Sequence, residues 1–151
     1  MIEIALYQPD IAPNAAAVMR MCACFGLRVR IIEPAGFTWS GATFRRAGMD
    51  YLAKADVVRE VNWEAFRAAT GGRRLVLIST AASLPHTDFA FAAGDILMMG
   101  RESAGVPAEV HDAADARLRI PMREGLRSLN VAMACAMVTG EALRQLRMFP
   151  P

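Results

Sequence analysis

The sequence predicts an α/β fold in which a mostly parallel β-sheet is flanked by helices. Short runs rich in Val, Ile and Leu alternate with longer helical stretches, which is typical of a parallel sheet covered on both faces. Since no repeat or linker interrupts the 151 residues, we expect one domain over residues 1–151. Ligands of such sheets bind at the carboxyl ends of the strands, so functional residues are expected there. The predicted strands are residues 2–7, 29–33, 75–80, 96–100 and 117–122, and the predicted helices are residues 14–25, 63–70, 107–112 and 128–147.

Composition narrows the class of protein. A chain that is 54% hydrophobic and 21% charged is expected to be compact and globular. No apolar stretch approaches the ~20 residues of a membrane span, and the start of the chain lacks the basic segment of a signal peptide. The cysteines and histidines lack metal-ligand spacing, which predicts reduced thiols, no metal site and a cytoplasmic location.

The basic residues are almost all arginine, and Lys54 is the only lysine. The arginines cluster at positions 45–46, 73–74 and 117–127. The planar guanidinium group suits phosphates and stacks on bases. The same clusters also fit an ordinary solvated surface, so charge alone leaves both interpretations open.

Two predicted helices have unusual polarity. Residues 14–25 are almost entirely apolar, with Asn14 at the position of an N-cap and Arg20 in the middle of the helix. Arg20 is either a side chain whose stem packs while its head reaches water, or a functional group. Residues 131–138 are apolar on all sides of their helix, and Ser128 suits its N-cap. Such a helix in a small domain predicts a homodimer with an apolar interface.

Two loops that follow predicted strands contain the polar residues best placed for chemistry. In residues 98–110, Gly100 and Gly105 permit close backbone approach or a positive φ, and Glu102 lies between them. Residues 120–134 combine a strand end, an arginine- and glycine-rich loop and Ser128. Each loop alone also fits a simple connection without a ligand. The dinucleotide-binding glycine motif, the P-loop and the nucleophile elbow are absent from the sequence, so it does not indicate those classes of protein.

In order along the chain, these segments resemble the three motifs of the SPOUT class of RNA methyltransferases. Residues 14–20 are similar to the first motif, residues 100–107 to the second, and residues 120–122 with 128–130 to the third. The resemblance is closer to the tRNA (cytidine(34)-2′-O)-methyltransferase subfamily and covers essentially the whole chain. It includes IALYQPDIAPN at 4–14, IIEPAGF at 31–37, RRAGMDY at 45–51 and RSLN at 127–130.

The resemblance implies a deep trefoil knot near the C-terminal end, an exception to the usual absence of knots. It implies S-adenosylmethionine as cofactor, S-adenosylhomocysteine as product, no metal, and a homodimer whose active sites are completed across the interface. The implied RNA partner is the tRNA anticodon stem-loop, methylated at the wobble nucleotide, a cytidine or modified uridine at position 34 of leucine tRNAs. The residues that the resemblance assigns to the cofactor are Ile78, Thr80, Gly100, Gly105, Ile120, Met122, Ser128 and Leu129.

The implied reaction is an in-line attack of a ribose 2′-hydroxyl on the methyl sulfonium of the cofactor. Arg20 is similar to the arginine of the family's first motif. Because arginine stays protonated, it is expected to stabilise the developing alkoxide and not to act as a base. Asn14 and Asn130 are expected to orient the reactants, and Glu102 to position Arg20 or a main-chain turn.

The chain departs from the family at two places. Ala16 and Ala17 stand where the family commonly has glycine and asparagine, and Gly140 stands where it usually has a tyrosine. Both places lie near the substrate in the family. Two alternatives therefore stay open, namely 2′-O-methylation of another site in tRNA or ribosomal RNA, and a non-catalytic RNA- or nucleotide-binding module on the same fold.

Overall fold

A computed structural model describes the backbone of residues 1–151 and every side chain except that of Met49, which belongs to the RRAGMDY segment. Over this described part, seven strands form one sheet in the order β3-β2-β1-β6-β4-β7-β5, and all neighbouring strands are parallel. The predicted α/β class with a mostly parallel sheet is confirmed. The strands are β1 (Glu3–Tyr7), β2 (Arg28–Ile32), β3 (Asp56–Glu60), β4 (Leu75–Ile78), β5 (Leu84–Pro85), β6 (Ile96–Met99) and β7 (Ala116–Arg119).

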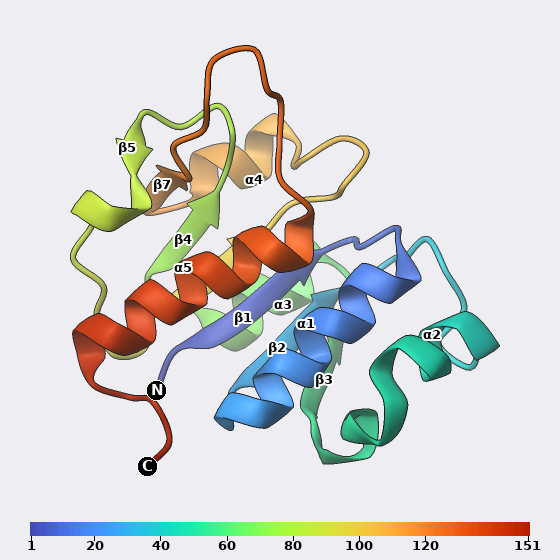
Figure 1. Ribbon diagram of the computed structural model, residues 1–151. Coiled ribbons are helices and arrows are strands. Elements are labelled where there is room, and N and C mark those ends of the chain that lie inside the picture. The colour runs from blue at the N-terminus through green and yellow to red at the C-terminus, as the bar shows by residue number, and fades with distance from the viewer.

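Helices cover both faces of the sheet (Figure 1). Alternation along β1 shows how the two cores arise, because Ile4 and Leu6 enter one core while Ala5 and Tyr7 enter the other. The first core is completed by α1, α2 and α5, and the second by α3 and α4. The helices are α1 (Ala12–Phe25), α2 (Ala42–Gly48), α3 (Trp63–Thr70), α4 (Ala108–Ala113) and α5 (Val131–Leu146), with short 3-10 helices η1 (Met49–Lys54) and η2 (His86–Asp88).

The connections of the sheet change direction between β1 and β6. Strand β1 pairs with β2 on one side and with β6 on the other. The chain leaves β1 for α1 on one face of the sheet and leaves β6 for α4 on the opposite face. The loops therefore diverge between β1 and β6, and a divergence of this kind is where open α/β sheets bind ligands.

Two predicted helix caps are wrong. Helix α1 begins at Ala12 and carries Pro13 in its first turn, so Asn14 lies inside the helix and is not its N-cap. Helix α5 begins at Val131, and its N-cap is Asn130, not Ser128. The Asn130 side-chain oxygen accepts hydrogen bonds from the backbone N–H groups of Ala132 (2.9 Å) and Met133 (3.3 Å). Since one oxygen satisfies two free donors of the first turn, Ser128 is left in the preceding loop.

Strands β3 and β5 and helix α2 were not predicted from the sequence. Strand β3 lies at one edge of the sheet and reads DVVRE, with only Glu60 fully buried, so it lacks the apolar run that marked the other strands. Helix α2 spans seven residues and β5 two. Elements this short or this exposed carry little periodic signal.

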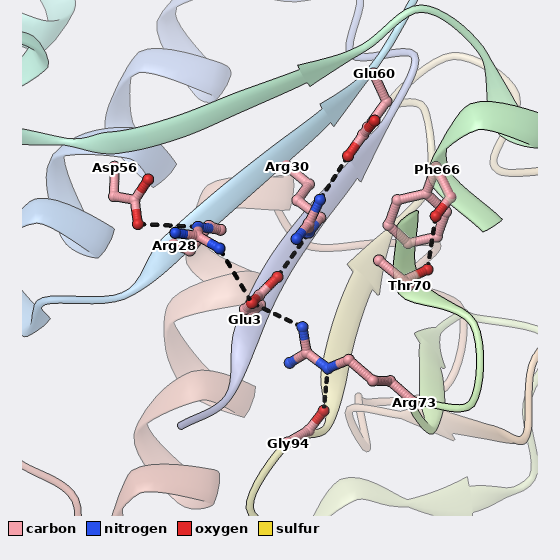
Figure 2. A network of polar contacts seen from close by, with 9 residues as sticks. All are labelled: Glu3, Arg28, Arg30, Asp56, Glu60, Phe66, Thr70, Arg73 and Gly94. Atoms are coloured by element: carbon pink, nitrogen blue, oxygen red, sulfur yellow. Dashed lines mark hydrogen bonds and ion pairs between the residues drawn. The ribbon is translucent and has the colours of Figure 1, made fainter. Parts of the chain in front are cut away.

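An ion-pair network secures the sheet beside β1 and β2 (Figure 2). Arg30 of β2 is buried and its guanidinium contacts Glu3 at 2.7 Å and Glu60 at 2.5 Å. Arg73 contacts the same Glu3 carboxylate at 2.7 Å. A buried guanidinium without partners would strongly destabilise the fold, so these carboxylates are required by the burial of Arg30.

Candidate active site

A cavity of about 530 Å³ lies at the carboxyl ends of β4, β6 and β7. Its volume is within the range of small-molecule sites, roughly 300–1,000 Å³. The loops that follow β4, β6 and β7 form most of its wall, and the start of α1 adds Ile11 and Asn14. All the sequence-predicted cofactor residues line this cavity, together with three of the four predicted catalytic residues: Asn14, Ile78, Thr80, Gly100, Glu102, Gly105, Ile120, Met122, Ser128, Leu129 and Asn130.

The loop after β6 is closed tightly on itself. The N–H of Arg101 donates to the carbonyl of Gly105, and the N–H of Gly105 donates back to the carbonyl of Arg101, both at 2.9 Å. A Cβ atom on Gly100 would lie 2.9 Å from the Gly105 backbone, and Gly105 has a φ of 62°. Gly100 is therefore needed for contact within the loop itself, whereas the sequence analysis ascribed both glycines to their permissive backbone in general.

Asn14, Glu102 and Asn130 form one hydrogen-bonded chain beside the cavity. Asn14 Nδ2 donates to Glu102 Oε1 at 3.4 Å, and Asn130 Nδ2 donates to Asn14 Oδ1 at 2.9 Å. Because Asn130 also caps α5, the chain of hydrogen bonds joins the start of α1, the loop after β6 and the start of α5. The three motif segments are thus held together by their polar side chains as well as by the sheet.

Asp10 reinforces this arrangement, although the sequence analysis did not select it. Its N–H donates to Glu102 Oε2 and the Glu102 N–H donates to Asp10 Oδ1, both at 3.2 Å, while Ser103 Oγ donates to Asp10 Oδ2. Hydrogen bonding with Glu102 and then with Ser103 lowers the pKa of Asp10 to about 2, against the opposing effect of burial. Burial, followed by the neighbouring Asp10, raises the pKa of Glu102. Of the two carboxyl groups, Glu102 is therefore the one that takes up a proton first as the pH falls. The signal in the sequence that could have pointed to Asp10 is its position in the loop that directly follows β1.

Arg20 is the predicted catalytic residue that the structure does not bring to this cavity. It is exposed on α1, and its guanidinium carbon lies 4.6 Å from the centroid of the Tyr51 ring. Among the described residues that line the cavity, Arg20 is absent. The position of Arg20 in the sequence gave no indication of this separation, because the direction of α1 relative to the sheet decides it.

Neither a metal site nor a membrane span occurs among the described residues. No group of three or more His, Cys, Asp and Glu side chains is arranged to hold a metal ion there. No helix in that part of the chain is long and apolar enough to cross a membrane. Cys22 and Cys135 are buried free thiols, and Cys24 is an exposed one.

A parallel sheet with a cavity lined by loops at the carboxyl ends of its strands is the architecture of α/β proteins that bind small molecules. Residues 1–140 match the SpoU rRNA Methylase family, and the chain belongs to that family. It is 61% identical, over 95% of its length and 91% of the relative's, to a protein of Beijerinckia indica subsp. indica named tRNA (cytidine(34)-2′-O)-methyltransferase.

Solved structures of related proteins share the fold. One that concerns the 2-OH methylation of C/U34 on tRNA superposes with a TM-score of 0.93 at 37% identity, covering 97% of both chains. The AdoMet-bound rRNA methyltransferase of Sinorhizobium meliloti gives a TM-score of 0.86 at 26% identity, over 96% of this chain and 56% of that one. The predicted resemblance to RNA methyltransferases is confirmed by these relationships.

Proposed function

We propose that this protein uses S-adenosylmethionine to methylate the ribose 2′-hydroxyl of the wobble nucleotide in tRNA. The substrate would be cytidine or a modified uridine at position 34 of leucine tRNAs, bound through the anticodon stem-loop. The observation that carries the proposal is the hydrogen-bonded chain of Glu102, Asn14 and Asn130 at the wall of a cavity of cofactor size. The similarity to a tRNA (cytidine(34)-2′-O)-methyltransferase supports the choice of nucleotide.

The residues that line the cavity fit the proposed cofactor. Ile78, Ile120 and Leu129 offer apolar surface for a flat base, and the loops around them offer backbone groups for its polar edge. Gly100, Gly105, Thr80, Met122 and Ser128 would complete the contacts. Bound S-adenosylmethionine supplies an activated methyl group on its sulfonium and leaves as S-adenosylhomocysteine, so no metal is required.

Asn14 and Asn130 would orient the ribose, and Glu102 would hold Asn14 in place through the hydrogen bond between them. Arg20 would stabilise the charge that develops on the 2′-oxygen. Because Arg20 is exposed and does not line the cavity of its own chain, we assign it to the cavity of a second subunit.

A homodimer is supported by the exposed apolar surface of α1 and α5, which lie side by side (Figure 1). Met133 and Met137 of α5 are 60% and 47% exposed. Ala17, Arg20 and Cys24 follow each other along one exposed stripe of α1. A partner covering both helices would bury these methionines and contact Arg20. We further infer that residues 1–151 form a single cytoplasmic methyltransferase domain, with residues 120–130 threaded as part of a trefoil knot.

Incubation with unmodified leucine tRNA tests the substrate. We expect mass spectrometry of the digested RNA to find one new 2′-O-methylated nucleotide, located at position 34, with an equal amount of S-adenosylhomocysteine. Methylation only of ribosomal RNA would favour the first alternative. Cofactor binding without any S-adenosylhomocysteine would favour a non-catalytic binding module.

Two threonine variants test whether the cofactor binds in the cavity. Thr80 is exposed at the cavity wall, so Thr80→Trp should fill the cavity without disturbing the core, and should weaken S-adenosylmethionine binding by about tenfold or more in calorimetry. Thr87→Trp, on the exposed η2 outside the cavity wall, is the matched control and should bind normally. Equal affinity in both variants would show that the cofactor binds elsewhere.

A further inference from the structure

Arg101 lies at the wall of the cavity and has an anchored main chain. Its backbone is fixed by the two reciprocal 2.9 Å hydrogen bonds with Gly105. Its side chain is 38% exposed and extends toward the loop after β1. The residue is therefore presented by a rigid loop, next to the chain of Asp10, Glu102 and Asn14.

The hydrogen-bonding capacity of this guanidinium is almost unused. Its Nε–H is buried and has no partner among the described residues. One Nη donates to Gln8 Oε1 at 3.4 Å, and the other lies 3.9 Å from Asp10 Oδ2. Both distances are well beyond the 2.7–2.9 Å of a strong charge-assisted hydrogen bond.

Other arginines of this chain are fully engaged by the fold. Arg74 binds both oxygens of Asp95 at 2.8 Å and also the carbonyl of Ala90 at 2.9 Å. Arg117 donates to two backbone carbonyls. Arg101 thus stands apart from arginines whose role is to hold the structure together.

The nearest carboxylate does not neutralise Arg101 at close range. Asp10 Oδ1 already accepts the Glu102 N–H, and Asp10 Oδ2 already accepts the Ser103 hydroxyl. An exposed positive charge with unsatisfied donors therefore remains at the cavity wall. A buried N–H without a partner costs stability. An anion bound to Arg101 would therefore be stabilised by the opposite charge and also by the hydrogen bond that the Nε–H can then donate.

We propose that Arg101 binds a phosphate of the substrate RNA next to the ribose that is methylated. The inference rests on the function proposed above and adds a substrate-binding residue to it. A phosphodiester accepts two parallel hydrogen bonds from the Nε–Nη edge of a guanidinium. Turning that edge outward gives up two long contacts, the 3.4 Å hydrogen bond with Gln8 and the 3.9 Å ion pair with Asp10. A phosphate held there would fix the register of the RNA strand while Asn14 and Asn130 orient the sugar.

Three variants test this inference. In Arg101→Ala we expect the KM for tRNA to rise about tenfold, the effect of losing a charged hydrogen-bonding partner, with kcat changed far less. The slope of log binding constant against log salt for tRNA should fall by about one, because one phosphate contact is lost. Arg101→Lys should restore the salt slope but recover the KM only in part, since lysine keeps the charge and lacks the fork. Arg28→Ala is the matched control, because Arg28 lies at the amino end of β2, remote from the cavity, and its loss should leave both quantities unchanged (Figure 2).

Calorimetry without RNA separates the other source of an anion. If Arg101→Ala loses S-adenosylmethionine affinity tenfold and keeps its tRNA salt slope, Arg101 binds the cofactor carboxylate and the inference is overturned. It is also overturned if Arg101→Ala and Arg28→Ala give the same KM and slope as the wild type. Failure of the proposed function has a different signature, namely a wild-type protein that transfers no methyl group to tRNA at all.

Discussion

At the scale of single residues, Arg20 is the one predicted catalytic residue that lies outside the cavity. It lies over the Tyr51 ring on an exposed stripe of α1, and not at the wall of the cavity. Its contact with an aromatic face restrains the direction of the guanidinium. In the dimer proposed above, this exposed side chain would reach the cavity of the second subunit.

The first prediction follows from that role. Arg20→Ala should lower methyl transfer to tRNA by ~100-fold or more, the usual effect of removing one charge-stabilising donor. Its melting temperature and cofactor affinity should stay near those of the wild type, because the side chain is exposed and outside the cavity. Arg20→Lys should recover little. The assay is transfer of tritium from labelled cofactor at saturating concentration, and normal turnover in a folded Arg20→Ala protein would leave Arg20 as a solvated surface residue.

Residues differ in how well their roles can be predicted from the sequence. Asn14, Glu102 and Asn130 were assigned to one site by the resemblance to the family, in agreement with the expectation that ligands bind at the carboxyl ends of parallel strands. Their hydrogen-bond partners could not be predicted. The competition for the first N–H groups of α5 depends on the path of residues 120–130, and Asn130 prevails over Ser128. Asp10 and Arg101 are single charges in loops that follow strands, and the folded geometry is needed to distinguish them from surface residues.

At the scale of elements, the N-cap residue of α5, Asn130, makes two kinds of hydrogen bond. Asn130 Oδ1 caps the helix, while Asn130 Nδ2 donates to Asn14 Oδ1. Asn130→Ala should lose both interactions and lower the free energy of unfolding by about 1 kcal/mol, as for other lost N-caps. Asn130→Asp keeps an oxygen acceptor for the cap, but its second carboxylate oxygen would face the Asn14 Oδ1 that now accepts a hydrogen bond. It should therefore keep its stability and still lose most methyl transfer, which thermal melts and the tritium assay measure together. If both variants lose activity only in proportion to stability, Asn130 is a cap and nothing more.

Strands with a continuous apolar run could be predicted from the sequence, whereas edge strand β3, which lacks one, could not. The strands with continuous apolar runs, such as β4 and β6, were found within two residues of their bounds. Edge strand β3 was missed because its stability comes from pairing with β2 and from ion pairs such as Arg28 with Asp56 at 2.9 Å, which leave no apolar pattern. Tertiary pairing decides such a segment, and sequence periodicity does not report it.

At the scale of the whole molecule, the exposed apolar surface of α1 and α5 predicts a dimer. Met137→Arg should yield monomers, because a charge would be buried without a partner in the interface. Since Met137 is 47% exposed in the single chain, the monomer should still fold. Val61→Arg, at a 73% exposed apolar residue outside these helices, is the control and should remain dimeric in sedimentation velocity. A wild-type protein that sediments as a monomer at micromolar concentration would contradict the prediction.

The arrangement of the dimer makes a sharper prediction, which concerns how the two subunits share their active sites. Arg20→Ala leaves a subunit with a complete cavity, and Thr80→Trp leaves one with an intact Arg20 and a filled cavity. At a cofactor concentration well below the Kd of the Thr80→Trp variant, the homodimer of either variant should have little activity. Co-expression with two different tags isolates the mixed dimer, in which one site combines the open cavity of the first subunit with Arg20 of the second. If Arg20 acts across a two-fold interface, this mixed dimer should recover about half of the wild-type methyl transfer, because one of its two sites is complete. If Arg20 acts within its own chain, neither site is complete and the mixed dimer should be as inactive as its parents.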